Sequence, residues 1–199
     1  MYTFRRRASR EAHATLFRTG VVTRQAQFIK SRAASTASSR KLSLNGREVS
    51  IPTGLFIDGQ FVPAKGSNMF ESEDPSTGKP LLSISEGREE DVNEAVLAAR
   101  RTFQTWKDTD PTYRATLLHK LANILERNAE DMVALECADT GKTFQQCSTL
   151  DVPGSIGTLR YYAGWADKVL GLTSFNIPGT FAYTRREPIG VCGQIIPWK

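Results

Sequence analysis

Apolar residues follow two different spacings along this chain of 199 residues, and each spacing predicts a different kind of element. Between residues 55 and 85, short apolar stretches are separated by turn residues: Asp58-Gly59 first, and then the run 74–78, Asp-Pro-Ser-Thr-Gly. Asp-Gly favours a tight hairpin because both central residues of such a turn need positive φ. These stretches therefore predict two antiparallel hairpins, the second with strands near 68–71 and 81–85.

From residue 89 onward, apolar residues recur every three to four positions, which is typical of helices with one buried face. The first helix opens near Glu89, and a second follows the capping residue Asp110. A third spans 129–138 and stops at Gly141, and a fourth spans 155–169. The inward faces are expected to carry Val92, Val96, Ala99, Phe103 and Trp106 in the first helix, and Ile156, Leu159, Tyr162, Ala163 and Ala166 in the fourth.

The last part of the chain predicts a further ribbon and then a buried strand. Residues 170–177 and 181–186 flank the turn Pro178-Gly179. The apolar run 189–196 is short, rich in β-branched residues and bounded by prolines, which suits a strand of a parallel sheet. Parallel strands need neighbours joined by long crossovers. We therefore expect an α/β protein whose remaining strands come from a longer chain, and an isolated chain that is prone to aggregation.

Charge is divided unevenly along the sequence. Residues 1–47 contain 11 Lys or Arg and one acid, whereas residues 48–199 have a net charge of −5. Residues 1–45 are rich in Arg and Ser and poor in acids, as mitochondrial transit peptides are, which predicts location in the mitochondrial matrix. The alternative is a basic arm that binds nucleic acid or anionic lipid. The acidic remainder argues against a nucleic-acid surface there, and no apolar stretch is long enough to span a membrane.

One motif resembles a phosphate-binding loop, but its context argues against that chemistry. Gly141-Lys142-Thr143 matches the end of a P-loop, which also needs a glycine five residues earlier. That position is Glu136, whose carboxylate would repel a phosphate. We interpret the motif as the end of a helix.

Other candidate groups also favour structural roles. The three cysteines are too widely spaced for a disulfide framework or a zinc site, and Cys137 and Cys147 are interpreted as buried or partly buried thiols rather than nucleophiles. His119 lies on a leucine-striped helix and is interpreted as a surface or packing residue. Two further clusters are interpreted as a packing face and a solvated strand end, rather than as a base-stacking platform and an anion site: Tyr161, Tyr162 and Trp165, and Arg185 with Arg186.

The run 187–198, Glu-Pro-Ile-Gly-Val-Cys-Gly-Gln-Ile-Ile-Pro-Trp, resembles the stretch that leads into the cofactor-binding domain of NAD(P)-dependent aldehyde dehydrogenases. The resemblance covers about residues 52–198. Further motifs resemble the family in the same order: Leu55-Phe-Ile-Asp-Gly, Asp74-Pro-Ser-Thr-Gly78, Glu90-Asp-Val, Ala98-Ala-Arg100, 135–142 and Arg160-Tyr-Tyr-Ala-Gly-Trp-Ala-Asp-Lys168.

This resemblance implies a fold and a set of site residues. Residues 52–199 would form the N-terminal part of the aldehyde dehydrogenase fold: helices, antiparallel ribbons and the first strand of a Rossmann-like parallel sheet. The ribbon at 171–187 would mediate association into a homo-oligomer or with a full-length aldehyde dehydrogenase. Asp139 would lie near a structural monovalent cation. The residues along the cofactor, NAD or NADP, would be Ile195, Ile196, Pro197 and Trp198.

The resemblance also implies a reaction in which a thiolate attacks an aldehyde, hydride passes to the nicotinamide and the thioester is hydrolysed. The family's catalytic cysteine and general-base glutamate have no counterpart in this chain, and Lys199 stands where the family has its oxyanion-stabilising asparagine. We therefore expect the N-terminal part of an enzyme that oxidises aldehydes to carboxylic acids, inactive as this chain alone. The alternative is a non-catalytic interaction protein that modulates the assembly of full-length aldehyde dehydrogenases.

Overall fold

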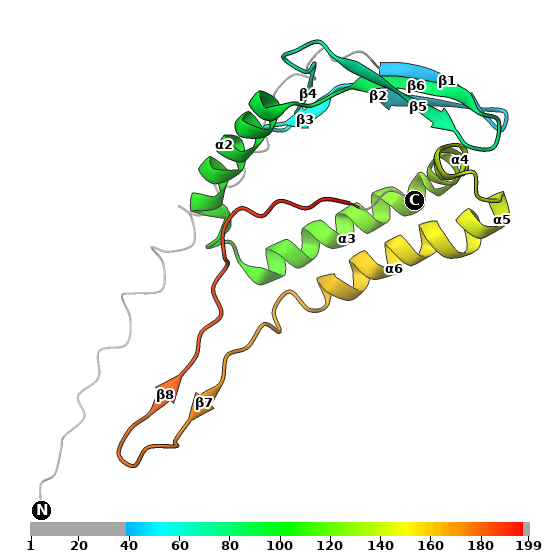
Figure 1. The fold of residues 1–199 in the computed structure, drawn as a ribbon. Coiled ribbons are helices and arrows are strands. Elements are labelled where there is room, and N and C mark those ends of the chain that lie inside the picture. Colours follow the sequence, from blue (N-terminus) through cyan, green and yellow to red (C-terminus); the bar gives the residue numbers. More distant parts are fainter. Residues whose placement is uncertain (1–38, 197–199) are drawn as a thin grey trace, which may run out of the picture. The chain divides into compact units, whose positions relative to one another are not determined.

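The computed structural model describes residues 39–196, which form antiparallel hairpins and helices (Figure 1). The strands are β1 (Ser39–Leu44), β2 (Arg47–Pro52), β3 (Leu55–Ile57), β4 (Gln60–Val62), β5 (Met69–Asp74), β6 (Lys79–Ser85), β7 (Thr173–Ser174) and β8 (Ala182–Tyr183). The helices are α2 (Glu89–Trp106), α3 (Pro111–Arg127), α4 (Ala129–Thr140), the short α5 (Phe144–Gln146), a π-helical turn η1 (Cys147–Asp151) and α6 (Val152–Ala163).

Both hairpins predicted between residues 55 and 85 are confirmed. In the β3–β4 turn, Asp58 has φ 52° and Gly59 has φ 77°, as a two-residue hairpin turn requires. Phe56 lies opposite Phe61 across the two strands, with ring centroids 4.9 Å apart. The β5–β6 hairpin pairs Met69 with Ser85 at its open end.

A hairpin that the sequence analysis missed precedes these two. Strands β1 and β2 pair from Ser39 with Pro52 to Leu44 with Arg47, and the turn is Asn45-Gly46 with φ 49° and 78°. Asn-Gly is a strong hairpin signal, but Asn45 is the last residue of the expected leader, and no hairpin was predicted there. The leader range 1–45 was therefore drawn too far toward the C-terminus, because residues 39–44 are part of the folded chain.

The helices begin and end where the local sequence favours it. Helix α3 has Asp110 as its N-cap, whose carboxylate accepts a hydrogen bond from the Thr112 backbone N–H, and Pro111 occupies its first position. Helix α4 ends at Gly141 in the left-handed conformation, with φ 71°. The stop predicted at Gly141 is confirmed, whereas α6 begins at Val152 and ends at Ala163, earlier at both ends than the predicted 155–169.

Helix α4 lies against the first and third hairpins. The Arg47 guanidinium of β2 contacts Glu130 at 2.6 Å and Asp131 at 2.9 Å, at the opening turn of α4. At the other end of α4, a Cβ added to Gly141 would lie 3.0 Å from Pro75 Cγ in the β5–β6 turn. Val133 and Ala134 of α4 are buried, and α4 contacts β1, β2 and β5. This packing keeps the β5–β6 turn close to the end of α4.

Helices α3 and α6 pack side by side (Figure 1). Small and branched side chains are buried on these two helices: Ala122 is fully buried, Ile156 is 7% exposed and Ala163 is 3% exposed. Two of the predicted inward residues of α6, Ile156 and Ala163, are thus confirmed. Tyr162 is not, because 60% of its surface is exposed.

The C-terminal elements differ most from the prediction. Strands β7 and β8 are only two residues long, although Gly179 with φ 77° makes the predicted turn between them. The predicted strand 189–196 has no strand pairing in the described chain. A strand is stabilised by hydrogen bonds to a neighbouring strand, and residues 39–196 supply no parallel neighbour for this one.

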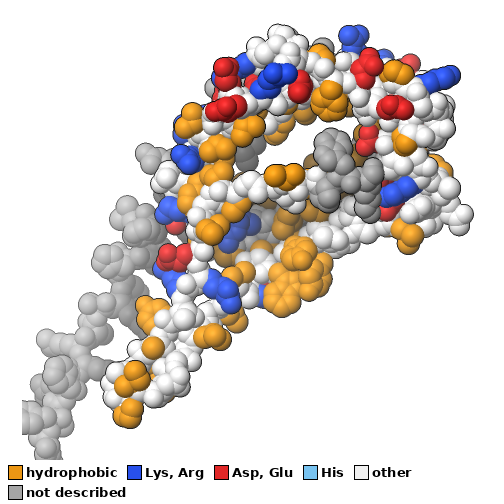
Figure 2. Space-filling model, viewed as in Figure 1, with side chains coloured by type: hydrophobic (Ala, Val, Ile, Leu, Met, Phe, Trp, Pro, Cys, Tyr) orange, Lys and Arg blue, Asp and Glu red, His pale blue; other side chains and the backbone are white. Residues whose placement is uncertain are grey.

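Much apolar surface is exposed along the helices and the C-terminal segments (Figure 2). Tyr161, Tyr162 and Trp165 were expected to pack against neighbouring elements, but they are 59%, 60% and 48% exposed. They contact one another instead, with the Tyr161 ring 5.2 Å from Tyr162 and 6.3 Å from Trp165. In α2, Val92 and Trp106 were also expected to be buried and are 57% and 42% exposed. Within the described residues, no helix is both long and apolar enough to cross a membrane.

Candidate functional site

The segment expected to lie along a cofactor is extended and solvent-exposed. Ile195 is 96% exposed and Ile196 is 63% exposed. Pro197 and Trp198, the other two expected cofactor contacts, and Lys199 lie outside the described residues. Cys192 is exposed as well, and its Sγ lies 3.8 Å from the Gly190 carbonyl oxygen. The described part of this segment therefore offers exposed apolar side chains and no strand pairing with the described residues, rather than an assembled pocket.

Asp139 lies on α4, where its carboxylate accepts a hydrogen bond from Ser72 Oγ of β5 at 3.0 Å. In the part of the chain that the structure describes, no three His, Cys, Asp or Glu side chains come together as a metal site. This hydrogen bond links α4 to β5. A monovalent cation near Asp139 remains a prediction from the resemblance.

The residues that resemble a P-loop form an ion-pair cluster instead. Lys142 Nζ contacts Asp151 Oδ2 at 3.0 Å and Glu136 Oε1 at 3.4 Å. The hydrogen bond to Asp151 is the largest of several effects that raise the pKa of Lys142. Thr143, the third residue of the motif, caps the short helix α5 by accepting a hydrogen bond from the Gln146 backbone N–H. The interpretation of this motif as a helix end is confirmed, because its lysine is already paired with two carboxylates.

The thiols of Cys137 and Cys147 lie beside this cluster. Cys147 is fully buried at the start of η1, and Cys137 is half-buried near the end of α4. Burial raises the pKa of Cys147 to about 11, and its hydrogen bond with Cys137 and the nearby Asp151 and Glu136 charges act in the same direction. A thiol with that pKa is almost entirely protonated at neutral pH, so Cys147 is a poor nucleophile.

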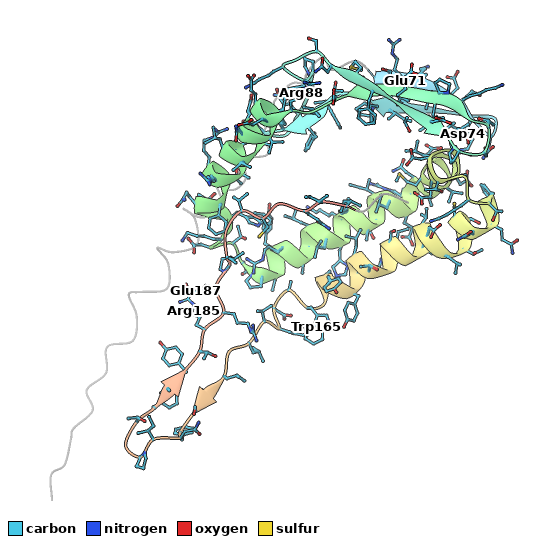
Figure 3. The ribbon with its side chains drawn as sticks, viewed as in Figure 1. Glu71, Asp74, Arg88, Trp165, Arg185 and Glu187 are labelled. Atoms are coloured by element: carbon cyan, nitrogen blue, oxygen red, sulfur yellow. The ribbon has the colours of Figure 1, made fainter. Side chains whose placement is uncertain are left out.

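Two aspartates within the motifs that resemble the family organise the backbone. Asp91, 4% exposed, accepts hydrogen bonds from the Arg88 N–H at 3.0 Å and the Lys65 N–H at 3.1 Å, and these bonds lower its pKa. The sequence analysis missed this role; an acid at the third position of a helix is the signal that could have found it. Asp74 accepts from the Ser76 hydroxyl and N–H, which holds the β5–β6 turn (Figure 3).

The ribbon that includes β7 and β8 exposes most of its apolar side chains. Phe175 is 72% exposed and Phe181 is 61% exposed, with their rings 5.3 Å apart. At its base, Arg186 Nε donates to the Leu170 carbonyl at 3.2 Å, and Arg185 contacts Glu187 at 3.6 Å (Figure 3). Arg185 and Arg186 are exposed, as the interpretation of a solvated strand end expects.

Comparison with known proteins relates this fold to one family. The sequence profile described as "Aldehyde dehydrogenase family" matches residues 61–199. An aldehyde dehydrogenase of Alternaria alternata is 48% identical over 149 residues, which are 74% of this chain and 30% of that protein. One from Aspergillus niger is 46% identical over 156 residues, covering 78% of this chain and 31% of that protein.

Solved structures give the same result. The NAD+ complex of the aldehyde dehydrogenase from Bacillus cereus has a TM-score of 0.66 and 37% identity, over 69% of this chain and 28% of that one. The expected fold class, an α/β chain that forms the N-terminal part of such a protein, is confirmed. This chain spans about a third or less of the length of these relatives. It belongs to the aldehyde dehydrogenase family.

Proposed function

We propose that this chain is the N-terminal portion of an enzyme that oxidises aldehydes to carboxylic acids with NAD+ or NADP+ as hydride acceptor. The observation that carries the proposal is the match of residues 61–199 to the family, with a shared fold over 69% of the chain. The NAD+ bound in the Bacillus cereus relative supports a nicotinamide cofactor. The exposed side chains of Ile195 and Ile196 would then be covered by the cofactor and by the remainder of the sheet.

We further propose that these 199 residues do not carry out the reaction alone. The attacking group of the proposed reaction is a thiolate. Cys147 is buried, protonated and near two carboxylates. Among the described residues, no imidazole or carboxylate is hydrogen-bonded to Cys192, whose thiol contacts a backbone carbonyl. The nucleophile would therefore be supplied by sequence that the relatives have beyond this match.

A chimera tests both statements. Residues 52–198 would replace the matching segment of the Alternaria alternata relative, so that this relative supplies every residue from position 199 onward. We expect aldehyde-dependent formation of NADH or NADPH by the purified chimera and none by the 199-residue chain. Activity of the 199-residue chain would contradict the second statement. A folded chimera that is inactive with both nucleotides would contradict the first.

Position 199 provides a matched control. The resemblance assigns this position to an asparagine amide that stabilises the oxyanion, and lysine cannot present the same neutral amide. A chimera that keeps Lys199 should lose about 10²–10³-fold in kcat relative to the same chimera with Lys199→Asn, which is the usual effect of removing one oxyanion donor. Equal rates would show that this residue does not contribute to oxyanion stabilisation.

We also propose import into the mitochondrial matrix. The composition of residues 1–38, rich in Arg and Ser and with Glu11 as their one acid, supports it. Fusion of this segment to a fluorescent reporter should direct the reporter to mitochondria, and a version with its arginines changed to glutamine should stay outside. If the unchanged fusion binds nucleic acid and is not imported, the basic-arm alternative holds instead.

An alternative function is favoured by one observation, the exposed apolar ribbon at 171–187. Phe175, Phe181 and Tyr183 are all more than half exposed there, and a patch of this kind is typical of protein–protein contact sites. In this alternative, the chain associates with full-length aldehyde dehydrogenases and modulates their assembly. Co-purification with a tagged full-length relative, lost in the double variant Phe175→Ser/Phe181→Ser, would support it. Equal recovery of both forms would contradict it.

A further inference from the structure

A cavity of about 670 Å³ lies where the turn between α2 and α3 faces the C-terminal segment (Figure 1). Its lining includes Phe103 and Trp106 of α2, Arg114 of α3, and Val169, Arg186 and Pro188 of the C-terminal segment. Pockets that bind small molecules typically have volumes of about 300–1,000 Å³. This cavity, called here the α2–α3 cavity, has that size, so the chemistry of its lining indicates what could occupy it.

The acids that line the α2–α3 cavity are paired with cations other than Arg114 and Arg186. The pairs are Asp108 with Lys107 at 3.0 Å, Asp167 with Lys168 at 2.7 Å, and Glu187 with Arg185 at 3.6 Å. Asp110, one helical turn before Arg114, caps α3 and accepts a hydrogen bond from the Thr112 N–H at 2.7 Å. Within the described range 39–196, no carboxylate forms a salt bridge with Arg114 or Arg186. Two positive charges on this lining are therefore available to an anion.

Both guanidinium groups are held in place by backbone carbonyls. Arg114 Nη1 donates to the Thr109 carbonyl and also to Thr109 Oγ1 at 3.2 Å. Arg186 Nε donates to the Leu170 carbonyl at 3.2 Å. A guanidinium has five N–H donors, so each arginine keeps donors for a ligand. Carboxylates accept two parallel hydrogen bonds from such a group, and these charge-assisted bonds are stronger than neutral ones.

The aromatic part of the lining comes from α2. Phe103 and Trp106 are three positions apart, so they share one face of that helix. Apolar spacing assigned this face to the interior, yet Trp106 is 42% exposed and Phe103 is half-buried. Val169 of the same lining is 66% exposed. A flat aromatic ligand would cover these side chains, and contacts between aromatic rings stabilise a complex beyond the area that they bury.

We propose that the α2–α3 cavity binds an aromatic carboxylate. The carboxylate is bound by the guanidinium groups of Arg114 and Arg186, and the ring lies against Phe103 and Trp106. The sequence analysis interpreted Arg186 as part of a solvated strand end, and its side chain is indeed exposed. The cavity that Arg186 shares with Arg114 gives it this second role, which the separation of the two residues along the chain conceals.

The test uses the full 199-residue chain and benzoate as the probe. In the variant Trp165→Phe/Trp198→Phe, Trp106 is the only tryptophan, so its fluorescence reports on the cavity. Benzoate should change this fluorescence in a saturable manner. Benzamide, which lacks the charge, and acetate, which lacks the ring, should each bind at least about tenfold more weakly. Equilibrium dialysis of labelled benzoate against the unchanged chain measures the same binding without the tryptophan substitutions.

Matched variants test the two arginines. Arg114→Gln and Arg186→Gln should each weaken benzoate binding at least about tenfold, because each removes charge-assisted hydrogen bonds. Arg127→Gln makes the same charge change at the other end of α3, away from the cavity lining, and should bind benzoate like the unchanged chain.

The outcomes separate clearly. If Arg114→Gln fails to fold, Arg186→Gln decides, because its side chain is exposed and its loss leaves no gap in the packing. The proposal is overturned if the unchanged chain shows no saturable binding of benzoate, if benzamide binds as tightly as benzoate, or if either folded glutamine variant keeps the original affinity.

Discussion

Arg160 of α6 donates to Glu126 of α3 through a contact of 2.6 Å between Nη2 and Oε2, and the same Nη2 also donates to Asn123 Oδ1 at 3.3 Å. Arg160 lies one residue before the exposed Tyr161-Tyr162 pair, so this ion pair borders the uncovered end of α6. Its two side chains are 41% and 56% exposed, and exposed pairs contribute little because water and salt screen them. The pair therefore orients the two helices, while the buried Ala122, Ile156 and Ala163 supply the packing energy.

The first prediction concerns the pH dependence of this ion pair. The hydrogen bond from Arg160 lowers the pKa of Glu126 below its ordinary value of 4.5. A lowered carboxyl pKa means that the unfolded chain binds the proton more readily, so the stabilisation is complete above pH 4.5 and is lost as the pH falls through the lowered pKa. Glu126→Gln should lower the thermal midpoint at pH 7 by a few degrees at most, and the difference from the unchanged chain should shrink below pH 4.5. A difference that grows on acidification would contradict the assignment.

The second prediction concerns Gly141, where α4 ends. Its φ of 71° is unfavourable for a residue with a Cβ, and that Cβ would lie 3.0 Å from Pro75 Cγ. Gly141→Ala should lower the free energy of unfolding by about 1–2 kcal/mol. Gly157 in the middle of α6 is the matched control, because an added Cβ there meets nothing within 4 Å. Gly157→Ala should raise stability by about 0.5–1 kcal/mol in urea titrations, and a loss at both positions would show that the turn geometry is not the cause.

The third prediction compares two isoleucines at opposite extremes of burial. Ile156 is 7% exposed on α6, whereas Ile195 is 96% exposed. Ile156→Ala should cost about 2–4 kcal/mol of unfolding free energy because it leaves a cavity beside α3. Ile195→Ala should change the stability of this chain by less than about 0.5 kcal/mol. In the chimera described above, however, Ile195→Ala should weaken NAD(P)+ binding, and unchanged binding there would argue against a cofactor role.

The fourth prediction concerns association of the isolated chain. The chain should associate in a concentration-dependent manner, because aromatic side chains of the 171–187 ribbon and isoleucines of the segment 189–196 are exposed. Phe175→Ser/Phe181→Ser should reduce the apparent mass in light scattering, whereas Lys41→Ser, on the exposed β1, should not. If both variants associate like the unchanged chain, the ribbon is not the contact.

Local sequence was a reliable guide wherever a few neighbouring residues determine the backbone. Asp58-Gly59 predicted its hairpin because only residues that tolerate positive φ suit that turn. Asn45-Gly46 carries the same signal at the boundary of the expected leader, where no hairpin was predicted. Asp110 followed by Pro111 marked the start of α3, and Gly141 marked the end of α4. In each case the information needed lies within one turn of chain.

Predictions of which side chains are buried were less successful, because burial requires a neighbouring element that covers them. Apolar spacing assigned Val92, Trp106 and Tyr162 to buried faces, but burial depends on what covers a face, and the described chain covers these only in part. The ion pairs of Lys142 were not predictable either, since Glu136 and Asp151 meet this lysine only when α4 and η1 pack together. Spacing along a helix indicates which side chains share a face and not what lies opposite.

The same division holds for the protein as a whole. The sequence alone determined the Asp58-Gly59 turn, the start of α3, the end of α4 and membership of the aldehyde dehydrogenase family, because these depend on short-range backbone preferences and on a run of matching residues. Only the tertiary structure decided that Lys142 pairs with Glu136 and Asp151, and that the segment 189–196 pairs with no strand of the described residues. These outcomes depend on contacts between segments distant in sequence, which form only when burial and pairing compensate for the entropy of ordering the chain.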